Sequence, residues 1–243
     1  MKLDCKMMWA LTALAYAIYL TIALVWFLPV GGWDVLVRYA PMADAFARGD
    51  WHEAFHPRFC VLFQALSGSV SWLFGISGLR GCQIVAVTFW IFSGPALWAV
   101  VRRIYDDETA FWSVCLLFVA TEFFGLAGDG WRDDCRILPI LLSVLGFQLL
   151  LGRRPDDGAC KGALTLGFAL FLGVTLRVDC LPVAVVLLLA FAVLCVRRRR
   201  WLLPVVPAVF FAAGVLADSA MVFAYTGYFV PAPHYIKILE VLT

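Results

Sequence analysis

Long uncharged apolar runs, separated by short charged segments, dominate the hydrophobic pattern of this chain. The first run, residues 7–30, holds 24 residues without a charge and follows Lys2 and Lys6. A membrane-spanning helix needs about 20 mainly apolar residues. Because this run is too long for the apolar core of a signal peptide, we predict a retained signal anchor with a cytoplasmic N-terminus.

Eight further apolar runs follow. They cover residues 59–74, 81–101, 109–128, 137–152, 162–176, 180–196 and 201–217, with a softer run at 219–236. The runs are solid and do not show the alternating pattern of β-barrel strands, which favours helices. We therefore predict an all-α polytopic membrane protein.

Basic residues in the short loops determine the predicted topology, because Lys and Arg in such loops stay cytoplasmic. The basic clusters are Arg102 with Arg103, Arg153 and Arg154 with Lys161, and residues 197–200. An odd number of crossings must then separate the outer loop at Asp34 from Arg102. The run at 59–74 has only 16 residues and several polar ones, so we expect it to lie at or dip into the outer interface. Without this run and the softer one at 219–236, seven spans remain, and the C-terminus is predicted to lie outside.

Composition agrees with this class and excludes others. Of the 243 residues, 63% are hydrophobic and 15% charged, against about half and about a quarter in soluble domains. This composition is the opposite of that of disordered chains. A net charge of +2 lacks the basic footprint of a nucleic-acid-binding protein. The eight cysteines form no CxxC or Cys/His cluster, and a single bridge between Cys135 and Cys180 stays open.

Charged side chains collect in three loops on the predicted outer side. The first, residues 31–78, begins near Asp34 and continues at helical spacing, which predicts an amphipathic helix that ends near Gly49. The second covers residues 128–136, and the third is the hairpin at 177–179. Charged groups at the mouths of spans commonly line a cavity or pathway. A solvated membrane rim is the alternative interpretation.

A carboxylate and an arginine at a membrane surface suit transfer of a group from a lipid phosphate. The carboxylate takes a proton from an acceptor hydroxyl, and the arginine binds phosphate and offsets the charge of the leaving group. Glu122, inside a span, and Asp218, at the predicted outer end of the last span, either line the same cavity or pack between helices.

Several short motifs also occur in a fixed order. They are Asp34, Tyr39, Ala43 and Gly49; residues 53–57; residues 73–75 with Arg80; Arg132, Asp133 and Asp134; Gly167, Gly173 and residues 176–179; and residues 225–231 through Lys237. Their order and spacing resemble GT-C fold glycosyltransferases, which include protein O-mannosyltransferases, lipid A aminoarabinose transferases and the bacterial RgtA/B/C/D-like families.

The resemblance implies a fold and an activity. Residues 1–243 would form a single GT-C-like seven-helix transmembrane module, with juxtamembrane helices in the outer loop at 31–78 and without a C-terminal soluble domain. The enzyme would move a sugar, with inversion, from a polyprenyl-phosphate donor to an acceptor hydroxyl at the outer face of the plasma (inner) membrane. Because most relatives continue beyond this point, a partner subunit that supplies the remaining part is an open expectation.

The resemblance also implies site residues. Asp34 is the candidate general base, and Asp133 or Asp134 is the second acid. Arg177 is the candidate for binding the phosphate. The other substrate-binding candidates are His56, Tyr39, Arg132, Asp179 and Lys237. No cofactor is indicated with certainty, a divalent cation stays open, and the expected partners are the polyprenyl-phosphate sugar and membrane lipid rather than nucleic acid.

Two other functions stay open at this point. The chain could be a non-catalytic or split module that binds lipid or a partner subunit, or a small membrane transporter. A transporter would favour polar residues near the middle of the membrane and inverted repeats, whereas the charges here gather at one predicted surface. The sequence contains no P-loop, GxGxxG, GxSxG or HExxH motif.

Overall fold

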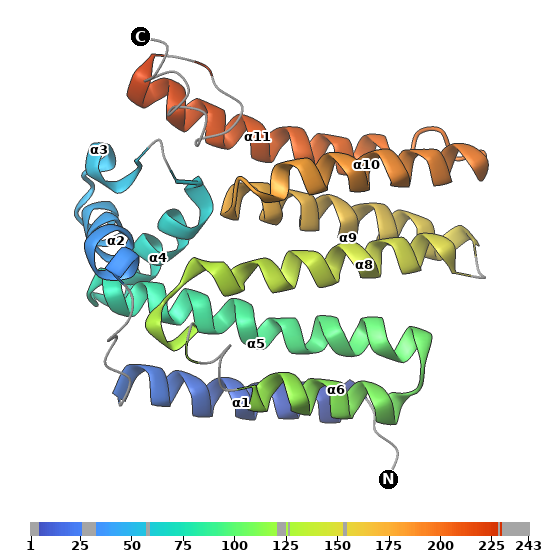
Figure 1. The fold of residues 1–243 in the computed structure, drawn as a ribbon, viewed down its shortest axis with the longest axis horizontal. Coiled ribbons are helices and arrows are strands. Elements are labelled where there is room, and N and C mark those ends of the chain that lie inside the picture. Colours follow the sequence, from blue (N-terminus) through green and yellow to red (C-terminus); the bar gives the residue numbers. More distant parts are fainter. Residues whose placement is uncertain are drawn as a thin grey trace. The chain divides into compact units, whose positions relative to one another are not determined.

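The computed structural model describes residues 5–25, 33–56, 59–120, 125, 127–152, 155–227 and 229. The secondary structure of these residues is helical, without a strand (Figure 1). Six helices among them are long and apolar enough to cross a membrane: Cys5–Val25, Gly78–Ile104, Arg132–Leu151, Gly158–Leu176, Cys180–Arg197 and Val205–Ala224. The prediction of an all-α polytopic membrane protein is therefore confirmed.

The chain divides into two compact units. The first comprises Met1–Ala54 and Phe63–Leu141, and the second comprises Phe55–Leu62 and Leu142–Thr243. Helices α4 (Val61–Phe74) and α8 (Ile137–Leu151) each contribute to both units.

In the first unit, helix α5 (Gly78–Ile104) packs against α1 (Cys5–Val25) and α6 (Asp107–Val119). The fully buried Trp90 of α5 lies at the centre of this contact. Its ring meets that of Tyr19 on α1 at 4.8 Å and that of Phe118 on α6 at 6.0 Å. The Tyr19 hydroxyl donates a hydrogen bond to the Phe118 carbonyl. The core of this unit is thus an aromatic cluster that joins three helices.

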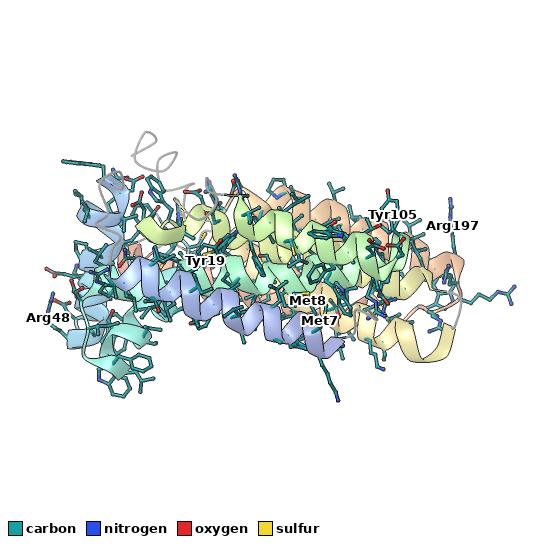
Figure 2. The ribbon with its side chains drawn as sticks, turned by 90° about the horizontal axis from the view of Figure 1, so that it is seen from below. Met7, Met8, Tyr19, Arg48, Tyr105 and Arg197 are labelled. Atoms are coloured by element: carbon teal, nitrogen blue, oxygen red, sulfur yellow. The ribbon has the colours of Figure 1, made fainter. Side chains whose placement is uncertain are left out.

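The segment after α1 forms short helices, as the apolar spacing predicts. A π-helical turn, η1 (Val35–Tyr39), continues into α2 (Ala40–Arg48), and α3 (Trp51–Ala54) follows. Helix α2 ends at Gly49, whose φ of 79° is a left-handed conformation that glycine adopts at little cost. The side chain of Arg48 points outward from this end (Figure 2). The predicted helix and its terminus at Gly49 are confirmed.

Helix α4 has 14 residues and falls short of the length that a span requires. One face of α4 is buried and carries Gln64, Ser67 and Ser71 as well as Phe63. A Cβ atom on Gly81 of α5 would overlap the Ser67 carbonyl oxygen, so the backbones of α4 and α5 approach closely here. The polar residues that argued against a span at 59–74 therefore belong to a helix–helix contact.

In the second unit, α9 (Pro155–Leu176) packs against α11 (Val205–Thr226) and α10 (Cys180–Arg197). Glycines bring the backbones of α8 and α9 together. A Cβ atom on Gly162 would lie 2.7 Å from the carbonyl oxygen of Gly146. Such small-residue contacts are common between membrane helices, because they permit close packing.

The predicted boundary at Asp218 differs from the structure. The runs at 201–217 and 219–236 were expected to be separate, but α11 continues through Asp218. That carboxylate is 3% exposed and accepts a hydrogen bond of 2.9 Å from the Val61 N–H. Because Asp218 has a partner inside the protein, it does not need to end the helix at a membrane surface, and the expected position at an outer helix end is wrong.

The span predicted at 109–128 is described only in part. Its helix α6 has 13 residues, and residues 121–124 and 126 lie outside the described residues, as does the role expected for Glu122. None of the eight cysteines forms a disulfide bond within either unit. The bridge between Cys135 and Cys180, which belong to different units, stays a prediction.

Candidate functional site

Asp34 stands at the start of η1, immediately before its first residue. Its Oδ1 atom lies 2.7 Å from Nη1 of Arg38, and the side chains are 33% and 38% exposed, respectively. One helical turn thus places an arginine against the candidate base and fixes the direction of its carboxylate. The remaining carboxylate surface is accessible to an incoming hydroxyl.

Tyr39, at the end of η1, lies against residues from other parts of the first unit. The residue is 3% exposed, and its ring packs at 5.7 Å against the ring of Phe63 on α4. The guanidinium of Arg132 lies over the same ring, 5.2 Å from its centre. Two of the predicted site residues, one from each of the first two predicted outer loops, are therefore in contact.

The second predicted loop contains a 3₁₀ helix, η2 (Arg132–Arg136), which runs directly into α8. Asp133 is half-buried, whereas Arg132 and Asp134 are only 8% and 5% exposed. Oδ2 of Asp134 is buried and has no hydrogen-bond partner among the described residues. A buried carboxylate oxygen without a partner costs free energy, and such groups are found disproportionately at functional sites.

A network of hydrogen bonds, which sequence reasoning missed, positions this second segment. Nε2 of Gln83, in the first turns of α5, donates to the carbonyl of Gly128 at 2.6 Å. Nη1 of Arg80 donates to Oε1 of Gln83 at 2.8 Å and to the carbonyl of Ala23, near the end of α1, at 2.9 Å. In the sequence, this network is indicated by the polar residues Arg80 and Gln83 at the start of an otherwise apolar helix.

Two aspartates next to this network, Asp44 and Asp129, are further residues of the candidate site. Oδ1 of Asp44 accepts a hydrogen bond of 2.5 Å from the N–H of Gly78 and thereby fixes α2 to the start of α5. Burial raises the pKa of Asp129 above its ordinary value of 3.8. The start of α5 is therefore a junction at which α1, α2 and the segment before η2 are held together.

The remaining candidates belong to the second unit. The hairpin between α9 and α10 is three residues long, and Nε of Arg177 lies 2.8 Å from Oδ1 of Asp179. The Arg177 side chain is 21% exposed, and that of Asp179 is 51% exposed. His56 is exposed and its ring is tilted against that of Phe59, 5.8 Å away. Lys237 lies outside the described residues.

The chemistry of the described site is that of carboxylates and guanidinium groups. Among the described residues, no group of three or more His, Cys, Asp or Glu side chains could hold a metal ion. Carboxylates can exchange protons with hydroxyls, and guanidinium groups can bind phosphate through paired N–H donors.

Comparison with known proteins adds no family to this description: no protein-family model matches the chain, and no curated protein or solved structure matches it. The class of protein is therefore defined by its helices, and the site by its geometry.

Proposed function

We propose that this protein is a membrane glycosyltransferase, which moves a sugar from a polyprenyl-phosphate donor to an acceptor hydroxyl at the outer face of the membrane. In this proposal the chain adopts the GT-C-like arrangement that its motifs resemble, with a cytoplasmic N-terminus. The reaction forms a bond from the anomeric carbon to the acceptor oxygen and breaks the bond from that carbon to the phosphate oxygen of the donor, so that polyprenyl phosphate leaves with the electron pair. The proton of the acceptor passes to a carboxylate.

One observation carries the proposal. Asp134 is 5% exposed with an unpartnered Oδ2, and two residues away Arg132 lies over the ring of Tyr39. A buried acid and a buried base within one short helix are costly to desolvate. A substrate hydroxyl would supply the hydrogen-bond donor that Oδ2 of Asp134 lacks, and an anionic group on the same substrate is the kind of ligand that a guanidinium binds.

Asp34 is the proposed general base. Its carboxylate is partly exposed and is oriented by Arg38, as a base must be before it meets its hydroxyl. Asp133 and Asp134 are the proposed acids of the second segment, where they hold the sugar hydroxyls or a cation. Tyr39 contributes by fixing Arg132.

Arg177 is the proposed ligand of the donor phosphate, and His56, Asp179 and Lys237 are further substrate contacts. In the structure Nε of the Arg177 guanidinium donates a hydrogen bond to Oδ1 of Asp179. Guanidinium groups bind phosphate through paired N–H donors, and the contact with Asp179 orients the side chain of Arg177.

The test is transfer of radiolabel from a defined polyprenyl-phosphate sugar by the purified full-length protein in a zwitterionic detergent. A panel of such donors and lipid or glycan acceptors is incubated with the protein and with an Asp34→Asn and Asp134→Asn double variant. Donor-dependent transfer by the unmodified protein alone supports the proposal. If no donor in the panel is consumed although each is bound, the catalytic role is wrong and a binding module remains.

A further inference from the structure

The turn that follows α10 has an unusual backbone. Arg199 has a φ of 57°, and the other described residues with positive φ are Gly49, Gly75, Gly130 and Gly227. The N–H groups of Arg199 and Arg200 bond to the carbonyls of Val196 and Cys195, both at 2.9 Å. This is the hydrogen-bond pattern of a Schellman motif, in which the left-handed position is usually glycine.

An arginine at the left-handed position is strained, because its Cβ atom crowds the adjacent backbone. Glycine would satisfy the same hydrogen bonds without this strain. Strained residues of this kind are concentrated where the side chain has a role. The conformation of Arg199 therefore indicates that its guanidinium group binds a partner.

Neighbouring arginines differ in their partners. Arg198 donates from Nη1 to the Leu150 carbonyl at 2.7 Å and so binds the C-terminal end of α8. Arg197 and Arg199 are exposed, and their side chains form no hydrogen bond or ion pair with other described residues. The side chain of Arg197 extends outward from its helix in Figure 2. By contrast, Arg102 at the end of α5 lies 3.1 Å from Asp107 and stacks on a tryptophan.

Large apolar side chains follow the arginines directly. Trp201 is 66% exposed and Leu202 is 83% exposed. Tryptophan beside arginine is typical of the boundary between lipid headgroups and acyl chains. A free phosphate ion could use the guanidinium groups but would leave these apolar side chains in water.

We propose that residues 197–202, here called the arginine turn, bind the headgroup phosphate of an anionic phospholipid. Arg197 and Arg199 donate hydrogen bonds to the phosphate, and Trp201 and Leu202 insert beside the acyl chains. Basic clusters directly next to a membrane-spanning helix bind anionic lipids in this way. The site is separate from the residues assigned to sugar transfer and does not depend on that activity.

The experiment measures binding of fluorescent phosphatidylglycerol to the full-length protein in a zwitterionic detergent, with labelled phosphatidylcholine as the uncharged comparison. The variants are Arg199→Gly and the double variant Arg197→Gln, Arg199→Gln. Arg102→Gln is the matched control, because that arginine also ends a membrane helix but is already paired. Unlabelled inorganic phosphate and unlabelled phosphatidylglycerol serve as competitors.

We expect Arg199→Gly to weaken phosphatidylglycerol binding about fivefold and the double variant about 25-fold, at roughly a factor of five for each arginine. Arg102→Gln should bind as the unmodified protein does. Equal binding by Arg199→Gly would overturn the proposal. Complete competition by millimolar phosphate would also overturn it, because the site would then be one for a simple anion.

The same variant tests the argument from strain. In zwitterionic detergent without anionic lipid, Arg199→Gly should raise the midpoint of thermal unfolding by about 2–4 °C, since the left-handed position is relieved. A lowered midpoint would mean that the arginine side chain supports the fold itself, and the inference from its conformation would fail.

Discussion

The guanidinium of Arg132 lies over the ring of Tyr39, 5.2 Å from its centre. Both residues are buried, so the cation is held by an aromatic face where water is scarce, an arrangement that strengthens the interaction. The contact joins η1 to η2 and so connects the segment that carries Asp34 with the one that carries Asp134. This connection makes a shared site in the first unit physically reasonable.

Replacement of Tyr39 tests this connection. We expect Tyr39→Leu to lower the free energy of unfolding by about 2 kcal/mol, because a desolvated cation–π contact is lost. Tyr39→Phe keeps the ring and should cost much less. A double-mutant cycle with Arg132→Met, in which chemical denaturation gives the free energy of unfolding of each variant, measures the coupling energy between the two side chains. A coupling energy near zero would mean that the two side chains are merely adjacent.

Close packing of α8 on α9 gives a second prediction. Gly162→Ala places a methyl group 2.7 Å from the Gly146 carbonyl oxygen, and the helices must separate. We expect a loss of about 1–3 kcal/mol of stability, as for other overpacked sites. Gly152→Ala is the control, since its nearest atom would be 3.5 Å away. Equal melting temperatures for the two variants would contradict this packing.

The side of the membrane on which α5 begins is a third prediction. Ser77 caps α5, and the charge pattern of the loops assigns this end to the outer side. A Ser77→Cys variant of an otherwise cysteine-free protein should react with a membrane-impermeant maleimide added from outside. If Ser77→Cys were labelled only after the maleimide gained access to the cytoplasmic side, the predicted topology would be wrong.

Asp106 gives a prediction on pH. The carboxylate caps α6 and accepts a hydrogen bond of 2.7 Å from the Thr109 N–H, which lowers the pKa of Asp106 below its ordinary value of 3.8. Since the folded pKa is the lower one, the cap contributes stability above pH 3.8 and loses it as the pH falls through the folded value. Hydrogen exchange at Thr109 should accelerate in that acidic range, and Asp106→Asn should remove the dependence. An unchanged pH profile in that variant would assign the acceleration to another group.

The features that the sequence predicted well are local ones. The end of α2 at Gly49 follows from a glycine after an amphipathic segment, and the shortness of α4 follows from its serines and Gln64. The hairpin that carries Arg177 follows from two apolar runs separated by three residues. Each of these depends on neighbours within a few turns.

The features that the sequence did not predict depend on partners far along the chain. Asp218 was expected at a helix end because it directly follows the apolar run at 201–217, but the structure pairs its carboxylate with the N–H of Val61, 157 residues away. The role of Gln83 is similar, since its partner Gly128 belongs to a different segment. Residue spacing carries no information on such pairs. The burial of Arg132 and Asp134 also depends on tertiary packing, and so it could not be read from a charged loop.

The central claim is that Asp34 is the base of a glycosyl transfer reaction. The most direct measurement is the initial rate of sugar transfer at saturating polyprenyl-phosphate donor for Asp34→Asn, compared with Asp50→Asn, an exposed aspartate in the same loop. We predict that Asp34→Asn loses about a hundred- to ten-thousand-fold in rate with donor affinity retained, and that Asp50→Asn stays near the unmodified rate. A rate for Asp34→Asn equal to that of Asp50→Asn would contradict the account.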